Sequence, residues 1–332
     1  MPQLNCIIRM VGGLGNQLFQ YALGRSLESE LGARVRFDVS QYEKPGERRL
    51  SIMRLNTQVR TPSPLDKLLM RLSFGRTLHR CRPALRRVCP SAVWNVHEDA
   101  WGGGFDPEVR ELRGRWYLLG WWQNPAYFEL IRPTLLEEFK PRERLTRANV
   151  EIKRRIDRVN AVCVHVRRGD LARDPTGTAG SPWANHLQPL EYYQSSMADI
   201  RRRVRDPHFF VFSDDADWAK QHIHCDAPMD FLANNGAKRD YFDLYLMSSC
   251  RHFIIANSTF SWWGAWLSTY GQKQVIVPPK WASNGAGPPP GLIPEEWQIG
   301  SRPASAGAEL PTAAQAALPS AARADKRLEV GQ

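Results

Sequence analysis

Cysteine is scarce in this sequence and is not arranged to bind a metal or to cross-link the fold. Six cysteines are spread over 332 residues, and no two of them form a Cys-x-x-Cys pair. Cys6 and Cys163 fall inside short apolar runs, where buried free thiols are typically found. We therefore expect neither a disulfide framework nor a zinc site.

Long apolar runs are missing as well. No stretch approaches the roughly 20 apolar residues that a membrane-spanning helix needs. Residues 1–5 lead directly into a strand-like run and show no signal-peptide pattern. These two absences predict a cytoplasmic protein. The hydrophobic content of 42% and the charged content of 24% are those of a globular chain, and the length is sufficient for two domains.

Acidic residues are too few to balance the basic ones. With 45 Lys and Arg against 34 Asp and Glu, the chain carries a formal net charge of +11. Such a charge favours an anionic partner: a nucleotide, a nucleic acid or an acidic membrane surface. One basic run, Arg201–Arg205, would suit an RNA-binding protein, but no RNA-binding motif accompanies it. We expect no nucleic-acid partner.

A second basic segment, residues 61–90, has leucines at helical spacing among its arginines. A helix of that composition can lie on an anionic membrane, which would make the protein a peripheral one. The same pattern is more often an ordinary solvated helix face, and we prefer that interpretation.

The first half of the chain begins as a βαβ unit. Residues 4–10 form a strand-like apolar run, and a glycine-rich turn follows at 11–17. Apolar residues then recur every fourth position as far as Leu31, before a second strand at 34–38. Strand, turn, helix and strand in this order are typical of an α/β domain.

The glycine-rich turn allows two interpretations. Gly13, Gly15 and Asn16 can bring a ligand close to the backbone at a helix N-terminus, where amide donors and the helix dipole favour an anion. They can instead only shape the turn and cap the helix. The spacing matches neither the dinucleotide-binding pattern G-x-G-x-x-G nor the P-loop, so a generic nucleotide-binding assignment fails.

Strands and helices also alternate in the second half, after a charge-rich helical segment at 140–158. We predict an α/β protein with two facing Rossmann-like domains, residues 1–150 and 151–300, and a disordered tail at 301–332. The strand-like runs of the second half are 161–164, 208–212, 252–256 and 274–277, and its helical segments are 190–203, 240–249 and the residues up to Leu267.

Three strand ends of the second half carry polar residues, which would meet at one edge of a parallel sheet. The first is His165-Val-Arg-Arg-Gly-Asp170. Its two adjacent guanidiniums, Arg167 and Arg168, suit the forked geometry of a diphosphate. Alternatively, the segment is a loop closed by a salt bridge, in which Asp170 pairs with an arginine.

The second strand end carries Asp214 and Asp215. Either carboxylate can accept hydrogen bonds from the N1–H and the 2-amino group of a guanine, or Asp214 is only a turn residue. Asp215 and Asp217 also form a D-x-D pattern, which binds Mn²⁺ together with a nucleotide sugar in other enzymes. Because two arginines are already available to neutralise a diphosphate, we expect no metal.

The third strand end is Asn257-Ser258-Thr259, which opens another helix. Asn257, Ser258 and Thr259 would offer side-chain groups and backbone amides to a second phosphate. Alternatively, Ser258 or Thr259 is an N-cap and nothing more.

Five motifs in order resemble the α-1,2-fucosyltransferases of the bacterial and animal galactoside family. The resemblance covers about residues 5–285 and leaves out the tail. Leu171 stands where many relatives carry an aromatic residue, a change that concerns packing more than chemistry. The five motifs are Gly12–Ala22, Trp122–Asn124, His165–Asp170, Phe212–Asp215 and Asn257–Leu267.

This resemblance implies a GT-B fold and inverting transfer of L-fucose from GDP-β-L-fucose to the 2-hydroxyl of a galactose, with no metal or other cofactor. It implies that Arg167 contacts the β-phosphate and the leaving oxygen, and that Gly15 and Asn16 reach the donor. Gly13, His165 and the polar residues of the other strand ends complete the expected donor site. A metal-dependent glycosyltransferase that uses the D-x-D pattern and another nucleotide sugar is the alternative.

The acceptor implied is a galactose-terminated oligosaccharide or a lipid-linked glycan, made for a surface polysaccharide. Peripheral contact with the inner membrane is left open. Because the acceptor hydroxyl must lose its proton, a general base is expected. Asp38, at the end of the second strand, is our choice, although a structural role for it is also open; Asp170 and His165 are the other candidates.

Overall fold

The computed structural model describes residues 3–43, 48–74, 82–89, 92–99, 104–168, 187–282 and 286–300. Asp170 and the tail predicted at 301–332 lie outside these residues. Two sheets are present, and every pairing between their named strands is parallel. The structure therefore confirms the predicted α/β, GT-B-type class.

The first sheet comes from the first half of the chain and has four strands in the order β2-β1-β4-β3. Helix α1 covers one face, and α2 covers the other. Because both faces are covered, the central strands read as apolar runs rather than as alternating ones. The bounds are Asn5–Arg9 (β1), Leu14–Leu31 (α1), Arg34–Asp38 (β2), Pro64–Phe74 (α2), Asn95–Glu98 (β3) and Arg115–Leu119 (β4).

The second sheet has six strands in the order β10-β9-β8-β5-β6-β7. Its carboxyl edge presents the ends of β5, β6 and β8, so the three polar strand ends predicted from the sequence do share one edge. The strands are Asn160–Val166 (β5), Pro207–Ser213 (β6), Met229–Leu232 (β7), His252–Ile254 (β8), Val275–Val277 (β9) and Gln298–Ile299 (β10).

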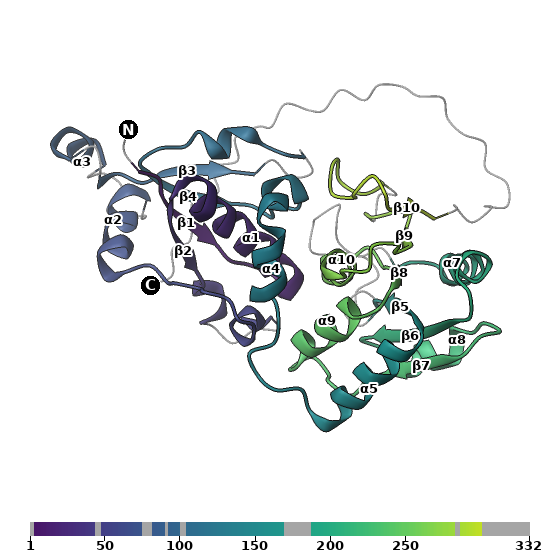
Figure 1. Cartoon of the computed structure of the whole chain (residues 1–332). Helices are drawn as coiled ribbons and strands as arrows, with labels where there is room; N and C mark the ends of the chain where they lie inside the picture. The colour runs from purple at the N-terminus through teal and green to yellow at the C-terminus, as the bar shows by residue number, and fades with distance from the viewer. Residues whose placement is uncertain are drawn as a thin grey trace, which may run out of the picture.

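The remaining helices connect or cover these sheets (Figure 1). They are Arg82–Val88 (α3), Arg132–Glu138 (α4), Arg147–Arg158 (α5), Leu190–Arg203 (α7), Ala216–His222 (α8), Asp240–Ser248 (α9) and Thr259–Leu267 (α10). The domain boundary predicted between residues 150 and 151 falls within α5 and stays a prediction. No helix in the described ranges is long and apolar enough to pass through a bilayer.

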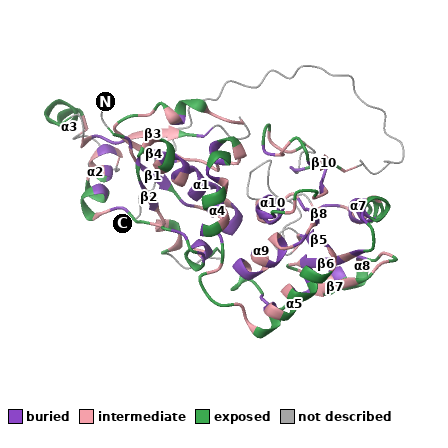
Figure 2. Cartoon of the chain, viewed as in Figure 1, coloured by how far each residue is buried: buried purple, intermediate pink, exposed green. Residues whose placement is uncertain are grey.

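Helix α1 lies between the two halves rather than on an outer face (Figure 1). The spacing of its leucines predicts one apolar stripe, yet twelve of its residues are buried, including Gln17 and Gln20. The reason is a second neighbour: besides the first sheet, α1 packs against α10 from the second half. Figure 2 shows both helices as mainly buried.

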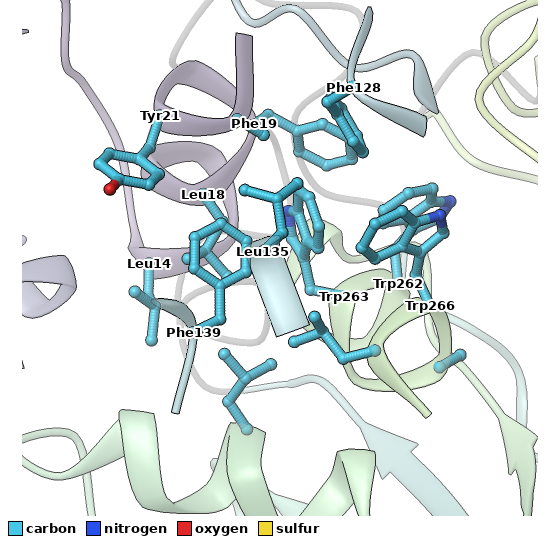
Figure 3. Packing of buried hydrophobic residues seen from close by; sticks show 14 of the residues in the cluster. Leu14, Leu18, Phe19, Tyr21, Phe128, Leu135, Phe139, Trp262, Trp263 and Trp266 are labelled. Carbon is cyan, nitrogen blue, oxygen red and sulfur yellow. The ribbon is translucent and has the colours of Figure 1, made fainter. Parts of the chain in front are cut away.

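Aromatic side chains fill the space between α1 and α10 (Figure 3). The ring centroid of Phe19 lies 4.8 Å from those of both Trp262 and Trp263, and the ring of Phe128 stacks on Trp263 at 5.1 Å. The Trp263 indole N–H donates to the carbonyl oxygen of Gly15 at 3.0 Å. Both halves therefore contribute to one hydrophobic core, which fixes the strand ends of one half against those of the other.

Strand β4 stops at Leu119, because the chain turns before Trp121 and Trp122. The carboxylate of Asp99 accepts the backbone N–H groups of Trp121 at 3.3 Å and Trp122 at 3.0 Å, and Trp122 has a φ of 56°. The side chain of Trp122 is fully buried, so the Trp122–Asn124 motif begins with a core residue.

Other differences concern the ends and the number of elements. The helical segment predicted at 140–158 begins only at Arg147, where Thr146 caps it by accepting the N–H of Asn149. Strands β3 and β7 and helices α4 and α8 were not predicted. β3, Asn-Val-His-Glu, is a polar edge strand whose side chains alternate between half-buried and exposed, which leaves no apolar run to detect.

Candidate active site

The glycine-rich turn is partly helix. Gly13 is the N-cap of α1, so Gly15 and Asn16 lie in the first helical turn. A Cβ atom on Gly15 would lie 2.5 Å from the backbone nitrogen of Phe260 and 2.6 Å from the carbonyl carbon of Thr259. A glycine is therefore needed at 15 so that the two helices can approach, whatever its role toward a ligand. A Cβ on Gly13 would meet nothing closer than 3.6 Å.

Two helix N-termini meet at this point, because Gly15 of α1 touches the first residues of α10. The α1 N-terminus has no side-chain cap, and that of α10 is capped by Ser258, whose hydroxyl accepts the N–H of Phe260 at 3.3 Å. Neither helix has an acidic residue in its first turn. The positive ends of two helix dipoles are thus directed to one place, which favours a bound anion.

Several polar side chains hold the turn in position. The hydroxyl of Tyr42 donates to the carbonyl oxygen of Gly12 at 2.7 Å, and the amide of Gln17 donates to the same oxygen at 3.0 Å. The amide of Gln123, just after β4, donates to the side-chain oxygen of Asn16 at 3.1 Å. The predicted donor residue Asn16 is therefore oriented by a second motif, Trp122–Asn124.

His165 ends the apolar run of β5 and is 7% exposed. Burial lowers the pKa of its imidazole to about 4; Asp214 opposes this shift and Arg167 adds to it. The ring is therefore neutral at pH 7, and its Nδ1 has no hydrogen-bond partner in the described part of the chain. The ring centroid lies 5.8 Å from that of Phe260 at the start of α10. A buried polar atom without a partner beside two helix N-termini suits a ligand contact.

Arg168 is held by groups from β6 and α8. Its guanidinium lies 3.8 Å from the ring centroid of Trp218, and its Nε is 3.5 Å from a carboxylate oxygen of Asp215. Its backbone N–H donates to Asp214 at 2.7 Å. Arg168 therefore forms an ion pair with Asp215. The pairing predicted for Asp170 lies outside the described residues and stays a prediction. Arg167, the preceding residue, is half-buried at the same edge.

The carboxylates proposed for guanine or metal binding have protein partners. Asp214 accepts from the backbone of Arg168, and Asp215 caps α8 by accepting the N–H of Trp218 at 3.2 Å. Asp217 lies in the first turn of α8. In the third motif, the amide of Asn257 donates to the carbonyl oxygen of Trp281 at 2.9 Å. Ser258 is the N-cap of α10, and Thr259 is its first helical residue.

Asp38 lies at the carboxyl end of β2, as predicted. One of its carboxylate oxygens accepts the hydroxyl of Tyr117 at 2.6 Å, and the other accepts the N–H of Ser40 at 3.0 Å. Both partners belong to the first half, so the structure gives Asp38 a clear local role. Asp170 lies outside the described residues.

Sequence reasoning missed the supporting residues of this site. Gln17 and Gln20 are fully buried although they are polar, and each binds the backbone of a loop that follows a strand: Gln17 binds residues 12, 49 and 52, and Gln20 binds residues 11 and 120. A signal was available, since both glutamines lie among the apolar residues of the first half of α1. Trp218, which lies against Arg168, gave no such signal.

Comparisons with known proteins point to one family. The sequence profile described as "Glycosyl transferase family 11" matches residues 111–285. The chain is 30% identical over 286 residues to the "Alpha-1,2-colitosyltransferase" of Escherichia coli, which covers 83% of this chain and 91% of that protein. It is 28% identical over 291 residues to the "O-antigen biosynthesis glycosyltransferase WbnK" of Escherichia coli, with coverage of 81% and 92%. It is 26% identical over 270 residues to the "Galactoside 2-alpha-L-fucosyltransferase SEC1" of Bos taurus, with coverage of 79% and 64%.

Proposed function

The chain belongs to glycosyl transferase family 11, and from this membership we propose that it transfers L-fucose from GDP-β-L-fucose to the 2-hydroxyl of a galactose, with inversion. The names of the relatives support the α-1,2 linkage, and the bovine one is a fucosyltransferase. The observation that carries the proposal is the meeting of the α1 and α10 N-termini beside His165, which lies just before the arginine pair in the chain. The backbone amides at two helix N-termini suit a diphosphate.

The leaving diphosphate gains negative charge as the bond to the sugar breaks. In our proposal Arg167 contacts the β-phosphate and the leaving oxygen, and the two helix N-termini and Arg168 complete the positive surroundings. Arg168 is already fixed by Asp215 and Trp218, so it would need no reorganisation during the reaction. Such preorganised charge stabilises the transition state more than the substrate.

The acceptor we propose is a galactose-terminated oligosaccharide or a lipid-linked glycan of a surface polysaccharide. The relative WbnK, named for O-antigen biosynthesis, supports this class. The first half of the chain would form the acceptor side, and Asp38 would take the proton from the attacking hydroxyl. We propose that no metal or other cofactor takes part.

A second donor has support of its own. The relative with 30% identity is named a colitosyltransferase, and colitose differs from L-fucose by the absence of the 3-hydroxyl group. A pocket that accepts one of these sugars needs little change to accept the other. The experiment below therefore offers both donors.

The test is incubation of the protein with GDP-fucose or GDP-colitose and a panel of β-galactosides, with and without EDTA, followed by linkage analysis of the product. We expect an α-1,2-fucosylated product that is formed equally in EDTA. Arg167→Ala should lower kcat/KM by about 10²- to 10³-fold, as the loss of an oxyanion donor does. Arg202→Ala is the matched control and should keep full activity, because Arg202 is an exposed residue that pairs with Asp199 on the same helix.

Three outcomes would contradict parts of this proposal. A preference for GDP-colitose would show that GDP-colitose, and not GDP-fucose, is the donor. Loss of activity in EDTA with recovery on addition of Mn²⁺ would favour the D-x-D mechanism at Asp215 and Asp217. Full activity of Arg167→Ala at unchanged unfolding midpoint would remove Arg167 from its assigned role.

A further inference from the structure

The outer face of α2 exposes two leucines. Met70 and Asp66 point inward, where Met70 packs with Ile7, Trp94 and Tyr117 of the first sheet's outer face. On the opposite side Leu65 is 61% exposed and Leu68, one turn later, is 49% exposed. Single exposed leucines are ordinary, but two neighbours on one short helix form a strip.

Basic residues border this strip. Lys67 and Arg71 are exposed beside it on α2, and α3, which packs against α2, carries exposed Arg86 and Arg87. Val88 at the end of α3 is 86% exposed. Figure 2 shows α3 as an exposed helix, and Figure 1 shows α2 and α3 at the edge of the first half that lies farthest from the second sheet.

Exposed apolar side chains concentrate here. Seven large hydrophobic residues are exposed within the described ranges, and three of them, Leu65, Leu68 and Val88, lie on these two helices. The charge is concentrated as well. Residues 61–90 contain seven Lys and Arg and one acidic residue, Asp66, within a chain whose net charge is +11. This one segment therefore supplies more than half of the excess positive charge.

The basic run on α7 is neutralised by nearby carboxylates. On α7, Arg202 and Arg203 pair with Asp199 at 2.8 and 3.0 Å, and Arg201 pairs with Asp226 at 3.2 Å. Asp66 of α2 is buried and already faces two other arginines from β2 and β4. Among the residues that the structure describes, no carboxylate lies within ion-pair distance of Lys67, Arg71 or the α3 arginines.

From this combination we infer that the α2–α3 surface, defined by Leu65, Lys67, Leu68, Arg71, Arg86 and Arg87, docks on an anionic lipid bilayer. Apolar side chains enter the boundary between headgroups and acyl chains, while neighbouring cations bind the lipid phosphates. A nucleic acid would satisfy the cations but not the leucines. The sequence favoured a solvated helix face at 61–90; the exposure of the leucines and the lack of carboxylate partners reverse that preference.

This surface gives the proposed transferase a direct route to a lipid-linked acceptor. It lies on the half that we propose as the acceptor side, and it leaves the strand ends of the second half clear of the membrane (Figure 1). The docking inference does not need the transferase activity to be correct, because binding is measured without substrates.

The experiment is sedimentation of the full chain with vesicles of phosphatidylcholine containing about one third phosphatidylglycerol, in about 0.1 M salt, where surface charges still interact. Each basic residue near an anionic surface contributes on the order of fivefold to binding. Lys67→Gln with Arg71→Gln should therefore lower the partition coefficient more than about tenfold. Leu65→Ser with Leu68→Ser should lower it by a similar factor. Pure phosphatidylcholine should bind little.

Matched controls keep the inference falsifiable. Arg201→Gln with Arg202→Gln removes the same charge from a neutralised run, and Leu130→Ser removes a leucine that is 76% exposed elsewhere. Both controls should bind vesicles as the unchanged protein does. All of these positions are on the surface, so unfolding midpoints should not move.

Three results would overturn the inference: no vesicle binding by the unchanged protein, equal losses in the control variants, or full binding by the serine variant. In the last case, binding of single-stranded RNA that the glutamine variant loses would identify a polyanion surface instead. Turnover of a soluble galactoside by every variant separates a failure of docking from a failure of the proposed function.

Discussion

Asp38 lies at the end of a strand, as the sequence predicts, but this position alone does not decide whether it is a base or a structural residue. The end of a strand is where α/β enzymes carry polar ligand groups, and Asp38 is there. However, both of its carboxylate oxygens already accept hydrogen bonds, from Tyr117 and Ser40. A carboxylate that accepts two hydrogen bonds is fixed in position, which suits a base and equally suits a structural brace.

The substitution Asp38→Asn separates these two roles. The Asn oxygen can keep the N–H of Ser40, and the hydroxyl of Tyr117 can turn to accept from the new amide. If Asp38 is the general base, kcat should fall about 10²-fold or more while the unfolding midpoint stays near that of the unchanged protein. Tyr117→Phe, which keeps the carboxylate, should retain most of the activity. Native activity in Asp38→Asn would move the base to another residue, with Asp170 as the next candidate.

At the scale of elements, the short strand β8 carries a histidine whose protonation would destabilise the fold. His252 is 5% exposed, and its Nδ1 accepts the backbone N–H of Gln274, before β9, at 3.1 Å. Burial lowers its pKa to about 4, and the charge of Arg251 adds to the shift. An unfolded histidine has a pKa near 6.5, so the unfolded chain binds the proton first as the pH falls.

The contribution of His252 to stability should therefore decrease as the pH falls from about 6.5 to about 4. This contribution is fully present above pH 6.5 and is on the order of 3 kcal/mol. His252→Asn keeps an acceptor near the position of Nδ1 and removes the titration. Urea unfolding at intervals across this range should show that the stability advantage of the unchanged protein over the variant shrinks as the pH falls. The comparison isolates His252, because Asp240 and Asp243, whose pKa values burial raises to about 6 and about 7, titrate in an overlapping range. Equal slopes would contradict the prediction.

At the scale of the whole molecule, α1 and α10 join the halves through one core. The approach is so close that a Cβ on Gly15 would lie 2.5 Å from the backbone of Phe260, while the indole of Trp263 binds the carbonyl oxygen of Gly15. Backbone atoms cannot move aside as a flexible side chain can. The glycine-rich motif therefore serves the joint between the halves as well as the proposed donor site.

Gly15→Ala should push the two helices apart. We expect it to lower the free energy of unfolding by about 1–3 kcal/mol, the usual effect of overpacking. Gly13→Ala is the matched control: its backbone is extended (φ −78°, ψ 177°), and the new Cβ would meet nothing nearer than 3.6 Å. Its stability should change by less than about 0.5 kcal/mol. Urea midpoints followed by tryptophan fluorescence and by circular dichroism provide the measurement. Equal stability of the two variants would show that the helices separate freely.

The sequence by itself determined the α/β class, the glycine-rich turn at the start of α1 and the three polar strand ends, because these depend on local apolar periodicity and on which residues follow a strand. It could not determine that α1 is buried on nearly all sides or that Asp215 pairs with Arg168. Only the tertiary structure decided these points, because each depends on which distant segment supplies the neighbour: α10 for Gly15, and the N-terminal end of α8 for Arg168.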